Sequence, residues 1–218
     1  FLVTLTSKDQ DGDRDGIFGQ LFNAAGNAVG GQIQVNNITP KEQRYSSVAT
    51  NANGEFVVSW ASKDLNSGKY DIHVRRFDAN GTSQGKQFRV SLTGDKDQFY
   101  SDVALADDGS YVVVWSARNQ DAGSDGIYAR RFQADGTPLG GEFLVNDSTP
   151  GLDEAFPSVG INSAGNFVVT WTTAGSEVYS REFDALGNPT TAGNIHVSTT
   201  ADAQFGGAVT VADNGPGI

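Results

Sequence analysis

The clearest chemical pattern of the chain is a run of four aspartates that alternate with other residues in the segment DQDGDRDG: Asp9, Asp11, Asp13 and Asp15. Carboxylate oxygens are the ligands that Ca²⁺ prefers, and the ion takes about six to eight of them. Gly16 permits the sharp turn that would let several carboxylates converge. The segment therefore predicts a calcium-binding loop, with a solvated acidic turn as the alternative interpretation.

The aspartate-rich segment is an incomplete version of an EF-hand loop. Its DxDxDG core places Gly19 and Phe22 at the ninth and twelfth loop positions, so a bound ion would need ligands from elsewhere. A weaker copy of the pattern, NQDAGSDG, contains Asp121 and Asp125, which we take as further candidate calcium ligands. The segment KDLNSGKYD is weaker still.

The composition excludes several functional classes. The 218 residues carry a formal net charge of −11, which opposes binding to nucleic acid or to an anionic membrane. The absence of cysteine excludes disulfides, zinc–thiolate sites and thiol catalysis, and no apolar run has the length of a membrane span. The chain starts at Phe1 without a basic leader, so we expect a mature or trimmed secreted product.

Two sequence strings alternate along the chain and define four repeats. Copies of GIYARRFQADGTPLGGEFLVN are each marked by one phenylalanine: Phe22, Phe77, Phe132 and Phe183. Copies of VVxW each end in a tryptophan: Trp60, Trp115 and Trp171. Both strings recur at about 50–56 residues, which is typical of an array of one supersecondary unit. We expect residues 1–218 to form a single domain of four such repeats.

Each repeat predicts four short strands separated by turn residues, and in one repeat these cover 47–50, 55–61, 72–77 and 87–91. A four-stranded unit of this length is typical of a β-propeller blade. The chain begins with a second-strand sequence, FLVTLTS, and ends with a first-strand sequence, AVTVADNGPGI. We predict an all-β, four-bladed propeller closed by pairing Val209–Val211 with Leu2–Leu5; the alternative is a fragment of a larger propeller.

The strings FVVxW, GIYARRFQADGTPLG and EFxVN resemble a repeat of large secreted bacterial proteins that often accompanies haemolysin-type (RTX) calcium-binding arrays. The chain is also distantly similar to sialidase-like and FG-GAP blades. RTX nonapeptides themselves are absent. The resemblance implies an extracellular, calcium-rich setting and names no substrate.

Every crossover between repeats carries an aromatic residue. Because successive strands of a blade run antiparallel, the crossovers and the aspartate-rich loops are expected at one end of the propeller and the tight turns at the other. Aromatic rings beside carboxylates and amides suit a sugar-binding surface, although the rings could instead plug the gaps between blades. The candidate ligand-binding residues are Tyr45, Tyr100, Phe156 and Phe205.

Catalytic motifs are missing from the sequence. His73 and His196 fall at different repeat positions, and acidic residues are too numerous to single out a pair for glycoside hydrolysis. Three arginines share one repeat position, where we expect pairing between blades rather than an anion site: Arg75, Arg130 and Arg181.

The favoured function is therefore a non-catalytic extracellular recognition or adhesion module with calcium-stabilised loops. Its expected ligand is a glycan or another cell-surface molecule. The alternative is a calcium-loaded structural spacer of a larger secreted protein. A secreted hydrolase is the third option.

Overall fold

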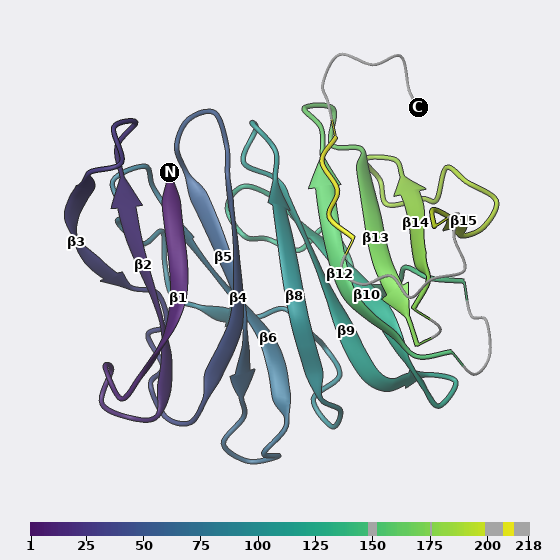
Figure 1. The fold of residues 1–218 in the computed structure, drawn as a ribbon, viewed down its shortest axis with the longest axis horizontal. Helices are drawn as coiled ribbons and strands as arrows, with labels where there is room; N and C mark the ends of the chain where they lie inside the picture. Colours follow the sequence, from purple (N-terminus) through teal and green to yellow (C-terminus); the bar gives the residue numbers. More distant parts are fainter. Residues whose placement is uncertain (148–151, 175, 199–206, 212–218) are drawn as a thin grey trace.

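A computed structural model describes residues 1–147, 152–174, 176–198 and 207–211 of the chain. These residues form antiparallel sheets (Figure 1), and within the described part no helix is long and apolar enough to cross a membrane. We call the four sheets blades 1 to 4 in chain order.

Blade 1 has three strands: β1 (Leu2–Lys8), β2 (Asp15–Phe22) and β3 (Ala28–Gln34). Blade 2 has four: β4 (Gln43–Thr50), β5 (Phe56–Lys63), β6 (Tyr70–Phe77) and β7 (Phe88–Arg89). Blade 3 has β8 (Gln98–Leu105), β9 (Tyr111–Asp121), β10 (Ser124–Phe132) and β11 (Phe143–Leu144). Blade 4 has β12 (Glu154–Ile161), β13 (Phe167–Thr173), β14 (Val178–Phe183) and β15 (Ile195–His196).

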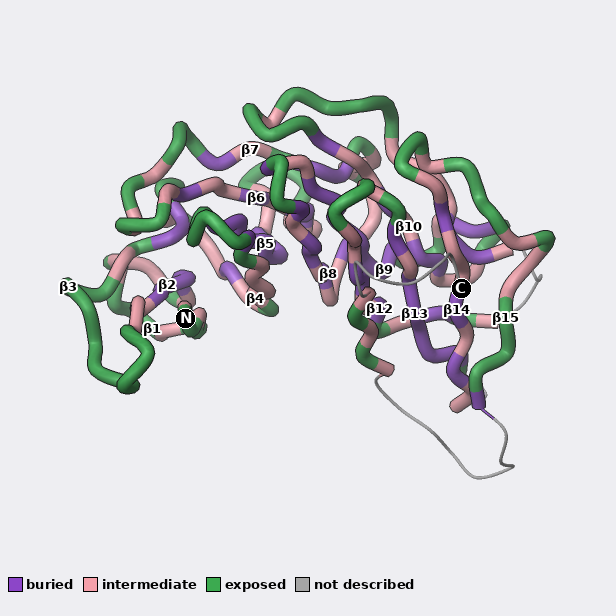
Figure 2. Tube along the Cα trace, turned by 90° about the horizontal axis from the view of Figure 1, so that it is seen from above, coloured by how far each residue is buried: buried purple, intermediate pink, exposed green. Residues whose placement is uncertain are grey.

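The blades stand side by side along an arc (Figure 2). The first strands of blades 2 to 4, which are β4, β8 and β12, follow the inner side of the arc. Strands β7 and β15 lie toward the outside. We call β4, β8 and β12 the innermost strands. Four-stranded antiparallel sheets in this radial order are blades of a β-propeller, as the repeat period predicts.

The hydrophobic cores lie between neighbouring blades. Side chains alternate between the two faces of a strand, so one face of β5 packs on blade 1 and the other on blade 3. The predicted core role of the repeated tryptophans is confirmed, because Trp60, Trp115 and Trp171 are fully buried.

The repeated arginines join each blade to the preceding one. Arg75 Nη1 donates to the Val35 carbonyl at 2.9 Å, and Arg130 Nη1 donates to the Val90 carbonyl at 2.9 Å. Arg181 Nη1 makes the equivalent bond, donating to the Val145 carbonyl at 2.8 Å. The expected position between blades is therefore correct, but the shared partner is a backbone carbonyl rather than a carboxylate.

The predicted ring closure is not confirmed. Among the described residues, β1 pairs with β2 alone, in a register that runs from Leu2 opposite Leu21 to Lys8 opposite Asp15. Residues 207–211 lie against blade 4, where Gly160 of β12 adjoins Thr210 and Val211. Blades 1 and 4 stand at opposite ends of the arc (Figure 2). In the described part of the chain, blade 1 therefore has no innermost strand.

Candidate functional site on the inner face

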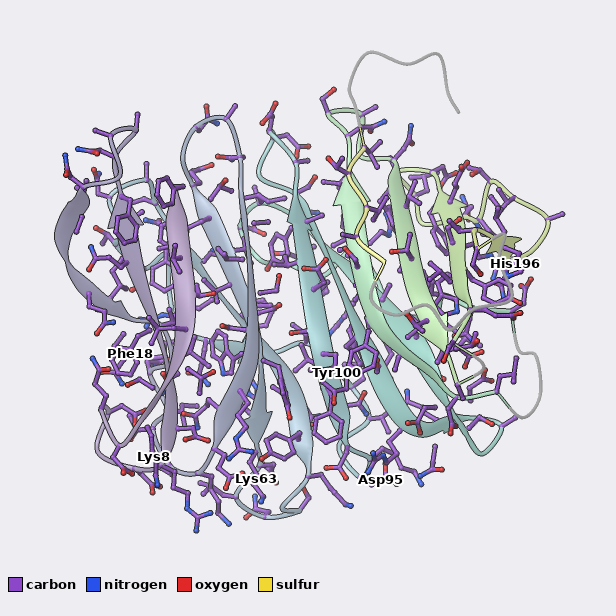
Figure 3. All side chains as sticks on the ribbon, in the orientation of Figure 1. Lys8, Phe18, Lys63, Asp95, Tyr100 and His196 are labelled. Atoms are coloured by element: carbon purple, nitrogen blue, oxygen red, sulfur yellow. The ribbon has the colours of Figure 1, made fainter. Side chains whose placement is uncertain are left out.

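The aspartate-rich loops and the crossovers share one end of the molecule. Lys8 and Lys63 precede such loops, Asp95 lies in the crossover before β8, and all three lie along the lower edge of Figure 3. Tyr100 lies above them, within β8. The predicted residues Tyr45, Tyr100 and Phe156 thus belong to the innermost strands themselves, close to the crossovers.

Each innermost strand contains a register shift with one aromatic residue inside it. The shifts fall between Arg44 and Ser47 in β4, and at the equivalent places in β8 and β12. Within them Tyr45, Tyr100 and Phe156 have φ values of 57°, 52° and 55°. Positive φ disfavours residues with a Cβ and costs about 1–3 kcal/mol. Its occurrence in three consecutive blades marks these positions as a shared feature of the inner face.

The Tyr100 ring contacts the rings of Tyr45 and Phe156 across the innermost strands. Ring centroids lie 5.0 Å apart for Tyr45 and Tyr100, and 4.5 Å apart for Tyr100 and Phe156. We call Tyr45, Tyr100 and Phe156 the inner aromatic cluster. It lines a shallow, open surface cavity of about 350 Å³, and 44% of Tyr45 and 45% of Phe156 are exposed. The predicted Phe205 lies outside the described residues.

Asp102 lines the same cavity and connects the innermost strands. Its carboxylate accepts hydrogen bonds from Ser47 Oγ of β4 at 2.5 Å, and from Ser158 Oγ and the Val159 amide of β12 at 3.1 and 2.9 Å. Blades 2 and 4 carry serine at this repeat position, so blade 3 alone of these three places a carboxylate there. Sequence reasoning missed Asp102, although that break in the repeat was visible.

A second, smaller cavity of about 140 Å³ adjoins the first, because both are lined by Tyr45 and Tyr100. Asp125, a predicted calcium ligand, lines it together with Arg118. The Asp125 carboxylate accepts a hydrogen bond from the Asn119 amide at 3.0 Å and lies 3.9 Å from Arg118 Nε. The inner aromatic cluster is therefore flanked by two carboxylates, Asp102 and Asp125.

Glu154 is a buried carboxyl at the start of β12. The equivalent residues of β4 and β8 are Gln43 and Gln98, which are also buried. Burial, followed by repulsion from Asp121, Asp153 and Asp125, raises the pKa of Glu154 from 4.5 to about 8. Among the described residues its Oε2 atom has no hydrogen-bond partner. Glu154 therefore remains protonated near neutral pH, as a neutral counterpart of the two glutamines.

The first predicted calcium loop has its carboxylates directed to separate protein partners. Asp11 accepts from Asn36 Nδ2 at 2.8 Å, Asp13 from the Lys41 amide at 2.8 Å, and Asp15 from Arg44 Nε at 2.7 Å. The Asp9 amide donates to the Arg14 carbonyl. These hydrogen bonds hold the loop against the segment that connects β3 to β4 and against the start of β4.

The second predicted loop repeats one of these contacts, since Asp121 accepts from Asn146 Nδ2 at 2.9 Å. Asn146 in turn accepts from the buried Ile127 amide at 2.8 Å. Within the described ranges, no group of three or more His, Cys, Asp or Glu residues is placed to hold a metal ion. Calcium binding by Asp9, Asp11, Asp13, Asp15, Asp121 and Asp125 stays a prediction.

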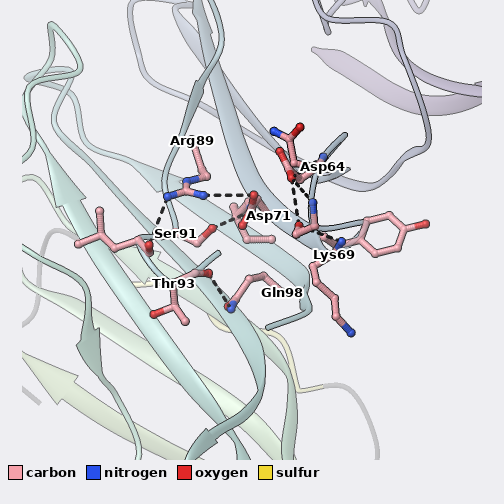
Figure 4. Close-up of polar contacts among 12 residues, drawn as sticks. Asp64, Lys69, Asp71, Arg89, Ser91, Thr93 and Gln98 are labelled. Atoms are coloured by element: carbon pink, nitrogen blue, oxygen red, sulfur yellow. Dashed lines mark hydrogen bonds and ion pairs between the residues drawn. The ribbon is translucent and has the colours of Figure 1, made fainter. Parts of the chain in front are cut away.

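The equivalent loop of blade 2 shows how its aspartates serve the local fold (Figure 4). Asp64 accepts from the backbone amides of Ser67 and Asn66 at 2.8 and 3.0 Å, and these bonds lower its pKa. Asp71 is buried, which raises its pKa, and it pairs with Arg89 at 3.4 Å. The two carboxylates therefore have different structural partners.

No protein-family model matches the chain, and no curated protein matches it. Solved structures nevertheless share its fold. An α-L-arabinanase from Penicillium chrysogenum, in complex with arabinobiose, has a TM-score of 0.61 at 11% identity, over 96% of this chain and 70% of its own. The endo-arabinase from Bacteroides thetaiotaomicron has a TM-score of 0.53 at 14% identity, over 94% of this chain and 72% of its own.

An α-L-arabinofuranosidase from Fusarium graminearum, in complex with an iminosugar inhibitor, has a TM-score of 0.56 at 11% identity. That similarity covers 90% of this chain and 66% of the enzyme. At such identities the similarity shows the propeller fold alone. It confirms the predicted similarity to propeller blades. The association with RTX arrays and the secretion of the protein stay predictions.

The favoured function from the sequence is contradicted. These similar structures are glycoside hydrolases, whereas the sequence favoured a non-catalytic recognition or adhesion module and then a calcium-loaded spacer. The error has a physical reason. Residues that meet on the inner face of a propeller come from different blades, so Asp102 and Tyr45 are separated by a whole repeat and form no local motif.

Proposed function

We propose that this chain hydrolyses glycosidic bonds at its inner face. The observation that carries the proposal is the convergence of Tyr45, Tyr100 and Phe156 with Asp102 on one cavity. Sugar rings have apolar faces that pack on aromatic side chains, and polar groups beside the rings fix their orientation. The hydrolase fold of the similar structures supports the same conclusion.

Two carboxylates are needed on either side of the scissile bond in most glycoside hydrolases. Asp102 and Asp125 line adjoining cavities that share Tyr45 and Tyr100. Three donors hold Asp102 in place, and we assign it the role of nucleophile or general base. Asp125 takes the role of the general acid.

The assignment of Asp125 as the acid rests on its position. Most glycoside hydrolases use two carboxyl groups, one of which protonates the leaving-group oxygen. Asp102 takes the other role, and Asp125 is the second carboxyl group that lines a cavity beside the inner aromatic cluster. It is therefore the one placed to pass a proton to a leaving-group oxygen.

The substrate class we propose is a polysaccharide or oligosaccharide, with arabinan as the first probe because two of the similar structures are arabinanases. Release of reducing ends from arabinan and from a panel of other plant and bacterial polysaccharides tests this. We expect Asp102→Asn and Asp125→Asn to lower the rate at least about 100-fold.

The matched control is Asp135→Asn. Asp135 is an exposed turn residue whose carboxylate accepts a hydrogen bond from the Thr137 amide at 2.7 Å. This variant should keep the wild-type rate. The proposal is wrong if the wild-type chain cleaves none of the polysaccharides, or if Asp102→Asn cleaves as fast as the control.

A further inference from the structure

The free face of blade 1 repeats the apolar residues that blade 2 buries. The strand registers and the stacked phenylalanine pairs show which positions of the two blades are equivalent. In order, the blade 2 residues Phe56, Val58, Trp60 and Phe77 correspond to the blade 1 residues Phe1, Val3, Leu5 and Phe22. The blade 2 residues are at most 2% exposed, since they pack on blade 1. Phe1, Val3 and Leu5 are 67%, 46% and 37% exposed.

The free face of blade 4 is the other half of the same interface. Val145 of blade 3 is completely buried against blade 4, but the equivalent Val197 is 49% exposed. Phe143 packs on the same core, whereas the equivalent Ile195 is 40% exposed. A cavity of about 490 Å³ on blade 4 is lined by Val168 and by Val211, because residues 207–211 already cover part of this face. Each end of the arc thus carries the surface that the other end would cover.

We propose that a second copy of this chain occupies these faces, with blade 4 of one copy packed head to tail on blade 1 of the other. The interface would continue the one that joins consecutive blades within the chain. Because the two faces differ, the contact is heterologous. Residues 207–211, which have a first-strand sequence and adjoin β12, would supply the innermost strand that blade 1 lacks.

One bond of the internal interfaces has no equivalent at this junction. Gln20 replaces the arginine that bonds to the preceding blade, and its Nε2 donates to the Leu21 and Val29 carbonyls of its own blade at 3.0 and 3.2 Å. We therefore expect the contact between copies to be weaker than the contact between blades, and to depend on protein concentration. It does not require the proposed hydrolysis, since the inner aromatic cluster lies elsewhere.

Sedimentation velocity on the wild-type chain and three aspartate variants tests the assembly. Val3→Asp places a charge on the blade 1 face, and Val197→Asp places one on the blade 4 face. Leu65→Asp is the control, since Leu65 is exposed in the β5–β6 loop. Wild type and Leu65→Asp should associate as concentration rises, whereas each interface variant alone should stay monomeric with an unchanged circular dichroism spectrum.

An equimolar mixture of the two interface variants gives the decisive result. The intact blade 4 of the Val3→Asp copy can meet the intact blade 1 of the Val197→Asp copy, so a dimer with one copy of each should form and grow no further. A wild-type chain that is monomeric up to about millimolar concentration overturns the proposal. Dimers of either variant alone, or none in the mixture, overturn it equally.

Discussion

At the scale of single residues, Glu154 makes stability depend on pH. The unfolded carboxyl ionises near pH 4.5, whereas the folded one stays protonated up to about pH 8. Between these values the folded state binds the extra proton, so the free energy of unfolding should fall by about 1.4 kcal/mol per pH unit. Glu154→Gln should remove that slope and be more stable than wild type at pH 8, as measured by urea unfolding at pH 5 and pH 8.

The neighbouring blades provide the reason to expect that glutamine fits this position. Gln43 is buried in β4 with its amide bonded to the Pro40 and Lys41 carbonyls at 3.2 and 3.1 Å. Gln98→Glu in β8 is the reverse change, and it should introduce a pH slope in a chain that already carries Glu154→Gln. If Glu154→Gln unfolds with the same pH dependence as wild type, the buried carboxyl does not hold the proton assigned to it.

Sequence reasoning located part of the candidate site at this scale. Tyr45, Tyr100 and Phe156 were predicted because an aromatic stands near every crossover, and the structure brings these three together. Their contact depends on three similar register shifts, which no residue pattern shows directly. Asp102 was missed because a single aspartate is inconspicuous in an acidic chain until the fold places it between two serines of neighbouring strands.

At the scale of the secondary-structure elements, the repeated arginines should hold the blades together. Arg130 bonds to the Val90 carbonyl of the preceding blade, and its guanidinium lies 5.4 Å from the centroid of the Phe132 ring. Hydrogen bonds to charged groups contribute about 1.5–3 kcal/mol. Arg130→Gln, which copies the residue of blade 1, should lower the free energy of unfolding by about that amount in urea titrations.

Arg14→Gln is the matched control for the arginine substitution. Arg14 is an exposed residue paired with Glu42 at 3.2 Å, and exposed ion pairs contribute about 0–1 kcal/mol. Equal losses in the two variants would show that the bond between blades adds nothing beyond an ordinary surface pair.

The aspartate-rich loop before β2 supports a prediction about calcium. Clustered carboxylates repel one another when no ion is bound, and an ion that binds only the folded state stabilises it by about 2.7 kcal/mol at a hundredfold excess over Kd. Chelator should therefore lower the melting temperature of the wild-type chain, and Asp13→Ala should abolish that sensitivity. A melting curve that does not change in excess chelator would leave the loop as a solvated turn held by Asn36, Lys41 and Arg44.

The strands themselves were predictable because the pattern repeats. Alternating apolar residues, Asn-Gly turns and a constant period located the four strands of blades 2 to 4. The position of the C-terminal segment was not predictable from the sequence, because a first-strand sequence can pack on the preceding blade without joining a second strand. Residues 207–211 lie in this way against β12.

At the scale of the whole molecule, the arc of blades decides what the inner face can do. Neighbouring innermost strands bring Tyr45 of blade 2, Asp102 of blade 3 and Phe156 of blade 4 to one cavity. Composition and charge predict that nucleic acid is not a partner, but they could not identify this convergence, since it arises only when the blades are packed in order. The proposed hydrolysis therefore depends on the three-dimensional assembly of repeats rather than on any one of them.

The most direct test of hydrolysis at the inner face is the steady-state kinetics of polysaccharide cleavage by wild type, Tyr100→Ala and Asp102→Asn. Loss of an aromatic platform should raise KM, because Tyr100 contacts both other rings of the cluster. Loss of the Asp102 carboxyl group should lower kcat at least about 100-fold. Wild-type kcat and KM in both variants, or no cleavage by the wild-type chain, would contradict the account.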